Sequence, residues 1–191
     1  MLEWYDFALL GYFITPISTH FLSADASPFL TWVVFGVGVA ARPFGSVIWG
    51  YVGDKHGRKR ALMLTVILMG ASTVLIGVLP GYNQAGYLGI FLLLCLRMGQ
   101  GIAMGGEYTG TLLLLMESSP KRFQGLWGSL GTLSLILGLL FASCMYNVLE
   151  VLEVSWRYAF LFSILFALVG YALRTSLVDT LMLSQRLPKN P

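Results

Sequence analysis

Long apolar runs alternate with short polar breaks along the whole chain, and this pattern predicts six membrane-spanning helices. A helix rises about 1.5 Å per residue, so about 20 apolar residues cross a bilayer. The runs and their turn signals place the helices near residues 4–22, 29–53, 60–79, 87–116, 125–149 and 157–175. The short breaks make consecutive helices antiparallel neighbours. We therefore expect an all-α membrane protein that forms a compact bundle.

The composition strengthens the membrane prediction and excludes other classes of protein. The 191 residues are 57% hydrophobic and only 11% charged, whereas soluble domains carry roughly 25% charged residues. The net charge of +3 gives no basis for a nucleic-acid partner, so membrane lipid is the expected surrounding. Cys95 and Cys144 lie inside apolar runs, and His20 and His56 have no nucleophile or ligand set beside them. We predict no enzyme activity, no metal site and no cofactor.

Basic residues are distributed unevenly, and their positions predict the orientation of the chain. They fall in the second and fourth breaks and near the end of the chain: Lys55, Arg58, Lys59, Arg60, Lys121, Arg122, Arg174, Arg186 and Lys189. By the positive-inside rule both termini are cytoplasmic, in what we expect to be a bacterial inner (plasma) membrane. Arg157 is the exception, and we expect the nearby Glu150 and Glu153 to offset its charge. We divide the chain into a six-helix bundle, 1–177, and a cytoplasmic tail, 178–191, that has the character of a truncated linker.

The second break, "GYVGDKHGRKRAL" at 50–62, holds more than an orientation signal needs. Lys and Arg alone would set the topology, but three glycines and Asp54 are spaced among them. Glycines allow tight turns and close approach of backbones, and an acid among bases suggests a specific ion pair. A phosphate-binding loop is excluded because its glycine and lysine spacing is absent.

This stretch resembles the signature of the major facilitator superfamily, G-x-L-x-D-R/K-x-G-R-R/K. The matching residues are Gly50, Gly53, Asp54, Lys55, Gly57, Arg58 and Lys59, with Val52 in place of leucine. A second stretch, "RMGQGIAMGGEYTG" at 97–110, is similar to the fourth helix of the superfamily. Together with "LEWYDF" and "ARPFG", it narrows the resemblance to the metabolite:proton symporters, of which the proline and glycine-betaine transporters are the most similar that we can name.

The resemblance implies a fold, a mechanism and a missing partner. Superfamily members carry twelve helices in two halves, and this chain resembles the N-terminal half, built from two inverted three-helix repeats. The complete transporter rocks one half against the other. Residues matching the family's cytoplasmic latch are Gly50, Gly53, Asp54, Gly57 and Arg58. The implied partner is a C-terminal half or a second copy of this chain. The fifth helix lacks the Gly-Pro motif of antiporters and the acid expected for betaine transporters.

Charged residues within the apolar runs predict the binding site. On the fourth helix Arg97, Gln100 and Glu107 share one stripe, with Arg97 and Glu107 about 15 Å apart along the axis. Arg42 lies near mid-membrane, and Asp6 lies at a depth similar to that of Glu107. Two cations above two acids suggest an anion site over a proton site. We predict substrate binding by Arg97, Arg42 and Gln100, and proton coupling by Asp6 and Glu107.

Other interpretations of the same residues remain open. Arg42 and Arg97 can be structural cations, held by backbone carbonyls or by Asp6 and Glu107. The glycines of the fourth helix are typical of close helix packing. Trp4, Tyr5, Tyr12 and Phe13 are a possible aromatic wall for a quaternary ammonium, although aromatic residues are common at membrane interfaces.

These patterns lead to one main hypothesis and one rival. The main hypothesis is the N-terminal half of a proton-coupled symporter for a small zwitterionic or carboxylate metabolite, such as proline, betaine or a dicarboxylate. It works by alternating access and needs a second half. The rival is a membrane protein that does not transport, and that either regulates a full-length relative or is an inactive truncated product.

Overall fold

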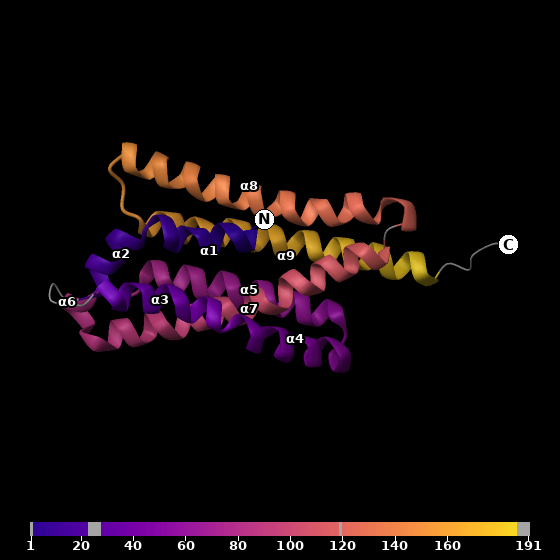
Figure 1. Cartoon of the computed structure of the whole chain (residues 1–191), viewed down its shortest axis with the longest axis horizontal. Coiled ribbons are helices and arrows are strands. Elements are labelled where there is room, and N and C mark those ends of the chain that lie inside the picture. Colours follow the sequence, from indigo (N-terminus) through magenta and orange to yellow (C-terminus); the bar gives the residue numbers. More distant parts are fainter. Residues whose placement is uncertain (1, 23–27, 119, 187–191) are drawn as a thin grey trace.

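The computed structural model describes residues 2–22, 28–118 and 120–186, and every regular element in these ranges is helical. The helices run side by side along one long axis (Figure 1). Their bounds are α1 (Leu2–Tyr12), α2 (Ile14–Phe21), α3 (Pro28–Ala40), α4 (Arg42–His56), α5 (Arg58–Val78), α6 (Tyr82–Ala85), α7 (Tyr87–Ser118), α8 (Gln124–Val151) and α9 (Arg157–Arg186), with a 3₁₀ turn at Lys121–Phe123. The predicted all-α class is confirmed.

The first two predicted helices are each divided into two. The breaks fall at Phe13, between α1 and α2, and at Ala41, between α3 and α4. Each break is followed within three residues by a proline, Pro16 or Pro43. Proline has no backbone N–H, so the helical ladder loses one bond just before it. Helical hydrogen bonds nevertheless continue across both points, from Phe13 N to Leu9 O over 2.9 Å and from Ala41 N to Val37 O over 3.0 Å. Helices α1 and α2, and likewise α3 and α4, therefore form one segment each, as the sequence predicted.

The remaining segments follow the predicted ranges, with one difference at the end of the chain. Helix α7 ends two residues beyond the expected range, whereas α9 continues to Arg186 instead of ending near 175. The predicted boundary between bundle and tail at 177/178 therefore falls inside a helix, and residues 187–191 of the tail lie outside the described part. The division itself stays a prediction.

Four helical stretches of the described chain are long and apolar enough to cross a membrane: Phe29–His56, Arg60–Val78, Tyr87–Glu107 and Gly125–Val151. The apolar part of α9, Arg157–Ala172, is shorter. Large apolar side chains also face outward, including Val47 at 73%, Phe91 at 61% and Leu168 at 61% exposure. An outer surface of this kind suits contact with lipid rather than water.

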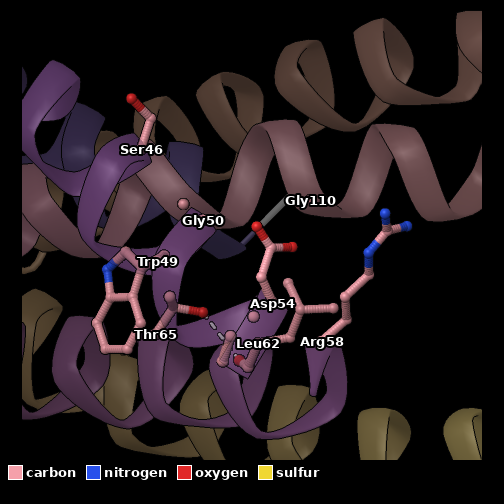
Figure 2. Close-up of a pocket in the computed structure, with 11 residues that line it drawn as sticks. Ser46, Trp49, Gly50, Asp54, Arg58, Leu62, Thr65 and Gly110 are labelled. Carbon is pink, nitrogen blue, oxygen red and sulfur yellow. Dashed lines mark hydrogen bonds between the residues drawn. The ribbon is translucent and has the colours of Figure 1, made fainter. Parts of the chain in front are cut away.

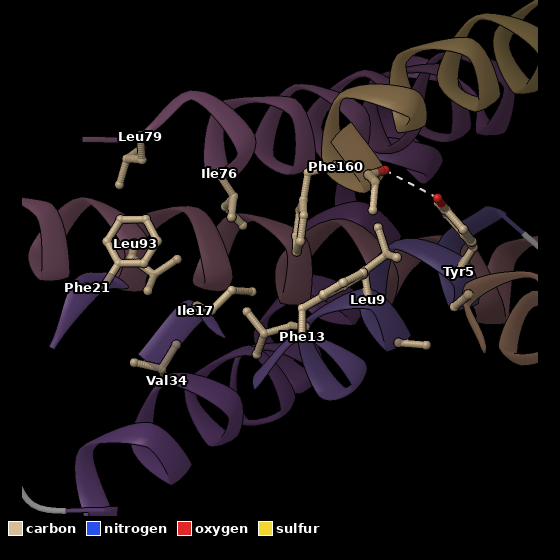
Figure 3. Close-up of a cluster of buried hydrophobic side chains, with 14 of the residues drawn as sticks. Tyr5, Leu9, Phe13, Ile17, Phe21, Val34, Ile76, Leu79, Leu93 and Phe160 are labelled. Carbon is tan, nitrogen blue, oxygen red and sulfur yellow. Dashed lines mark hydrogen bonds between the residues drawn. The ribbon is translucent and has the colours of Figure 1, made fainter. Parts of the chain in front are cut away.

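Helix α7 packs against α3, α4 and α5. Helix α5 also packs against α9, and α1 packs against α8 and α9. The core gathers between these helices, around Leu9, Phe13, Ile76 and Phe160 (Figure 3). The Tyr5 hydroxyl donates a hydrogen bond of 3.2 Å to the carbonyl oxygen of Ala159, which ties α1 to α9. This core fixes the helices that carry the buried charges.

Glycines bring α7 into direct backbone contact with α3 and α4. A Cβ atom on Gly101 would overlap the carbonyl oxygen of Gly38, and one on Gly105 would overlap that of Arg42. The packing role expected for these two glycines is confirmed. The contact also brings the start of α4, and with it Arg42, close to α7.

We expect Gly101→Ala to destabilise the chain because the added methyl group meets backbone rather than a flexible side chain. Overpacking of this kind costs about 1–3 kcal/mol. Gly36→Ala is the matched control in the neighbouring helix, since a Cβ there has no neighbour within 4 Å. Thermal unfolding of the detergent-solubilised protein measures both variants. Equal midpoints for the two would contradict the close packing at Gly101.

Candidate functional site

The interior of the bundle holds charged and polar side chains that the surrounding membrane makes costly. Asp6, Arg97, Gln100 and Glu107, all predicted as site residues, are at most 4% exposed. A charged group near mid-membrane costs about 2.5–3.5 kcal/mol on insertion scales, so each requires a partner or a function. The structure brings these four residues together between α1, α5, α7 and α9.

Arg97 is fully buried on α7 and is only partly satisfied. Its Nη1 donates a hydrogen bond of 2.6 Å to Oε1 of Gln100, one turn along the helix. Its Nε and Nη2 have no hydrogen-bond partner among the described residues. Two donor nitrogens of a guanidinium thus remain available in a place shielded from water. A purely structural cation would be expected to have these donors satisfied.

Arg42 lies close to the same place from the start of α4. Its guanidinium carbon is 4.2 Å from the ring centre of Phe7 and 5.5 Å from that of Trp4. The guanidinium carbon of Arg97 is 4.9 Å from the ring centre of Phe7 and 5.9 Å from that of Phe35. Both cations therefore use the ring of Phe7. Arg42 is half-buried, and its Nε also has no partner in the described chain.

A chain of buried polar groups leads from Arg97 toward Asp6. Gln100 accepts from Arg97 and donates through Nε2 to Oγ1 of Thr73, 2.7 Å away on α5. The Thr73 hydroxyl lies within reach of the carbonyl oxygen of Met69, at 2.9 Å, and of the Asp6 carboxylate. Because a hydroxyl has one proton, it serves one of these acceptors at a time. The chain links the predicted anion site to a predicted proton site.

Asp6 also receives a hydrogen bond from α9. Oγ of Ser163 donates to Oδ1 of Asp6 over 2.5 Å, and both side chains are buried. Sequence reasoning missed Thr73 and Ser163. No local signal could have found them, because a hydroxyl within an apolar helix usually bonds to its own backbone, as Thr65 does to Leu62.

The buried acids line a small pocket that lies apart from Arg97 and Gln100. The pocket has a volume of about 20 Å³, which is room for about one water molecule. Its lining residues are Glu3, Asp6, Val66, Met69, Gly70, Glu107, Ala167 and Gly170. The expected similar depth of Asp6 and Glu107 agrees with this arrangement. No group of side chains suited to a metal ion occurs among the described residues.

The four aromatic residues considered as a wall for a quaternary ammonium do not share one site. Tyr5 and Phe13 are buried in the core, and Tyr12 stacks on Tyr146 with ring centres 6.0 Å apart. Only Trp4 lies at the charged site, where Arg42 covers its ring. The structure thus provides no cage built from this set.

Four of the five predicted latch residues line a cavity of about 180 Å³ between α4, α5 and α7 (Figure 2): Gly50, Gly53, Asp54 and Arg58. Gly57 joins α4 to α5 with φ of +91°, a conformation that favours glycine. A Cβ on Gly50 would meet no atom within 4 Å, and one on Gly53 would make only ordinary contacts. Asp54 and Arg58 are exposed at the mouth of the cavity. The open space beside Gly50 suits a partner outside this bundle.

Arg157 joins three parts of the chain at the opposite end of the bundle. Its Nη2 donates to the carbonyl oxygen of Leu79 over 2.8 Å and lies 2.7 Å from Nε2 of His20. The ring of Trp156 lies under the same guanidinium, 5.7 Å from its carbon to the ring centre. These contacts hold the side chain, and the charge offset expected from Glu150 and Glu153 stays a prediction. Arg157 therefore anchors helix ends and lies apart from the charged site.

Comparisons with known proteins show a family to which the chain is similar. The model of the sugar (and other) transporter family matches residues 1–186. A putative proline/betaine transporter of Staphylococcus aureus (strain COL) is 38% identical over 94% of this chain and 41% of its own length. The shikimate transporter of Escherichia coli (strain K12) is 35% identical over 97% of this chain and 45% of its own length.

The fold agrees with that of solved transporters. The xylose transporter XylE of E. coli, in a partially occluded inward-open conformation, superposes with a TM-score of 0.81 at 19% identity. The match covers 92% of this chain and 45% of XylE. The chain thus spans less than half the length of these relatives, and it corresponds to their N-terminal half.

Proposed function

Because the chain belongs to the sugar (and other) transporter family of the major facilitator superfamily, we propose that it is the N-terminal half of a proton-coupled symporter. Its substrate is a small metabolite that carries a carboxylate. The observation that carries this proposal is the pair of partly satisfied guanidiniums over Phe7, one of which is joined through Gln100 to Thr73, a hydroxyl within reach of Asp6. A transporter family is not an enzyme family, so these groups bind and move ions rather than catalyse a reaction.

Each site residue has a role in this mechanism. Arg42 and Arg97 attract the substrate carboxylate, and Gln100 holds the Arg97 guanidinium in place. Asp6 or Glu107 carries the proton. A proton on Asp6 changes which acceptor the Thr73 hydroxyl serves, and Gln100 passes this change to Arg97. In this way a proton on Asp6 changes the affinity for the substrate, and bound substrate changes the affinity for the proton, through a short series of contacting side chains.

A second half completes the proposed transporter. One six-helix bundle supplies only one wall of a central cavity, and the two halves rock to expose it to each side in turn. The latch residues, with open space beside Gly50, form the cytoplasmic contact between halves. A separate C-terminal half fits this surface, and a second copy of the chain is the other candidate.

The proposal is tested by supplying the missing half. The chain is co-expressed with the C-terminal half of the S. aureus relative and reconstituted in vesicles with a more acidic exterior. We expect uptake of proline, betaine or shikimate by the pair, abolished by a protonophore, and no uptake by either half alone. If the correctly folded pair transports none of the three, the rival hypothesis of a non-transporting regulator is favoured. Uptake by purified monomeric chain would contradict the need for a second half.

The proposed topology places the N-terminus, residue 186 and the loop around Lys55 on the cytoplasmic side of a bacterial inner membrane. A single cysteine at Lys55 is introduced after Cys95 and Cys144 are replaced by serine. We expect an impermeant maleimide to label it only after the cells are opened. A cysteine at Gln84, in the short helix α6 between α5 and α7, is the matched control and should react in intact cells. The reverse labelling pattern would overturn the orientation.

A further inference from the structure

The charged site offers hydrogen-bond donors and positive charge, and the buried acids line a separate small pocket. The unpartnered nitrogens are Nε and Nη2 of Arg97 and Nε of Arg42, and all three belong to cations. Asp6 accepts from Ser163 and lines the separate small pocket with Glu3 and Glu107. A ligand that satisfies the unpartnered nitrogens must therefore supply acceptor atoms and negative charge.

The aromatic rings of the site are already used by the protein's own cations. Arg42 lies over Phe7 and Trp4, and Arg97 lies over Phe7 and Phe35. A quaternary ammonium is bound in proteins by aromatic faces or by a nearby carboxylate. At this place it would compete with a guanidinium for each ring and would lie close to two positive charges.

Exposure indicates which cation the ligand meets first. Arg42 is half-buried, whereas Phe7 is 8% exposed and Arg97 is fully buried behind it. A carboxylate that approaches Arg42 gains from the field of Arg97 as well, because both guanidiniums lie over one ring. A cationic group on the same ligand would be repelled by the same two guanidiniums, and the repulsion would weaken binding.

We infer that the site selects a carboxylate of net negative charge and discriminates against zwitterions such as proline and betaine. This inference rests on the proposed function, since it names the substrate class of that same site. It also runs against the name of the S. aureus relative, whose substrates are both zwitterions at neutral pH. A hydroxylated monocarboxylate such as shikimate has the expected charge.

The test compares ligands that differ in charge. The purified 191-residue chain is measured in nanodiscs, alone and with the C-terminal half of the S. aureus relative, by the shift of its unfolding midpoint with ligand at constant ionic strength. The probes are shikimate, shikimate methyl ester, proline and glycine betaine. We expect shikimate to bind at least tenfold more tightly than each of the other three.

Two variants test whether Arg42 is the source of the preference for shikimate. Arg42→Gln keeps a polar side chain but removes the accessible charge, and the preference for shikimate over proline should fall below about threefold. Arg157→Gln removes an arginine outside the site and should leave the tenfold preference intact. Full preference in a folded Arg42→Gln protein would overturn the assignment.

The remaining outcomes separate this inference from the proposed function. If proline or betaine binds as tightly as shikimate and Arg42→Gln weakens all of them, the carboxylate site stands and the charge selection is wrong. If the methyl ester binds as tightly as the acid, or if no probe binds to the chain with or without its partner half, both proposals fail.

Discussion

Replacing Arg97 by lysine is expected to lower proton-driven uptake by the reconstituted pair of halves on the order of tenfold or more, while the protein still folds. Lysine keeps the charge but loses the planar fork of donors. The lysine ammonium has no planar group that could donate to Gln100 from one nitrogen and lie over the Phe7 ring with its other donors directed to the substrate. A tenfold loss corresponds to about 1.4 kcal/mol of interaction with the substrate.

Two further variants separate this role from a structural one. If Arg97 only balances the charge of a buried acid, lysine should suffice for transport, and Arg97→Ala should mainly lower the unfolding midpoint. The alanine variant leaves Oε1 of the buried Gln100 without its donor, which costs about 1–3 kcal/mol. Arg122→Lys, at an exposed position outside the site, is the control and should change neither quantity. Normal uptake by a well-folded Arg97→Lys protein would remove Arg97 from the binding site.

The sequence predicted the segments well because each spans a run of apolar residues bounded by turn residues. It did not show the one-residue irregularities at Phe13 and Ala41, where the apolar pattern continues past a proline that removes one helical hydrogen bond. Hydropathy does not report a missing backbone hydrogen bond. It also failed at the end of α9, because a helix can continue into a polar segment when nothing interrupts its backbone ladder.

The candidate site was predicted in part, and the reason lies in how helices place side chains. The three- and four-residue spacing put Arg97, Gln100 and Glu107 on one face, and the structure buries all three. Spacing within one helix cannot show which other helix faces it. Thr73 on α5 and Ser163 on α9 therefore could not be connected to Asp6 before the packing was known.

Glycine patterns were predictive for the same reason. Gly101 and Gly105 are four residues apart, so they form one small face that admits a neighbouring backbone. The sequence indicated close packing there but not the partner. The structure shows that the partner backbone includes the carbonyl of Arg42, so packing and the placement of charge depend on the same contact.

Asp6→Asn is expected to abolish proton-driven accumulation of the substrate while substrate exchange continues. Asparagine can still accept a hydrogen bond from Ser163, so the fold around α1 and α9 should survive. It cannot gain or lose a proton in the working pH range. Reconstituted pairs carrying this variant should therefore lose accumulation driven by a pH gradient, with the inside-to-outside ratio falling to about one. Exchange of labelled for unlabelled substrate without a gradient should stay within about threefold of the original.

Glu107→Gln decides which acid carries the proton. Asp6 is connected to Arg97 through Thr73 and Gln100, so we expect its loss to abolish accumulation, whereas Glu107→Gln should reduce accumulation less than Asp6→Asn does. Thr73→Val tests the connection itself, because it keeps the shape and removes the hydroxyl between Gln100 and Asp6. This variant should retain exchange but lose the dependence of substrate affinity on external pH. If Asp6→Asn still accumulates substrate while Glu107→Gln does not, Glu107 carries the proton and the chain of buried hydrogen bonds serves only to hold Arg97.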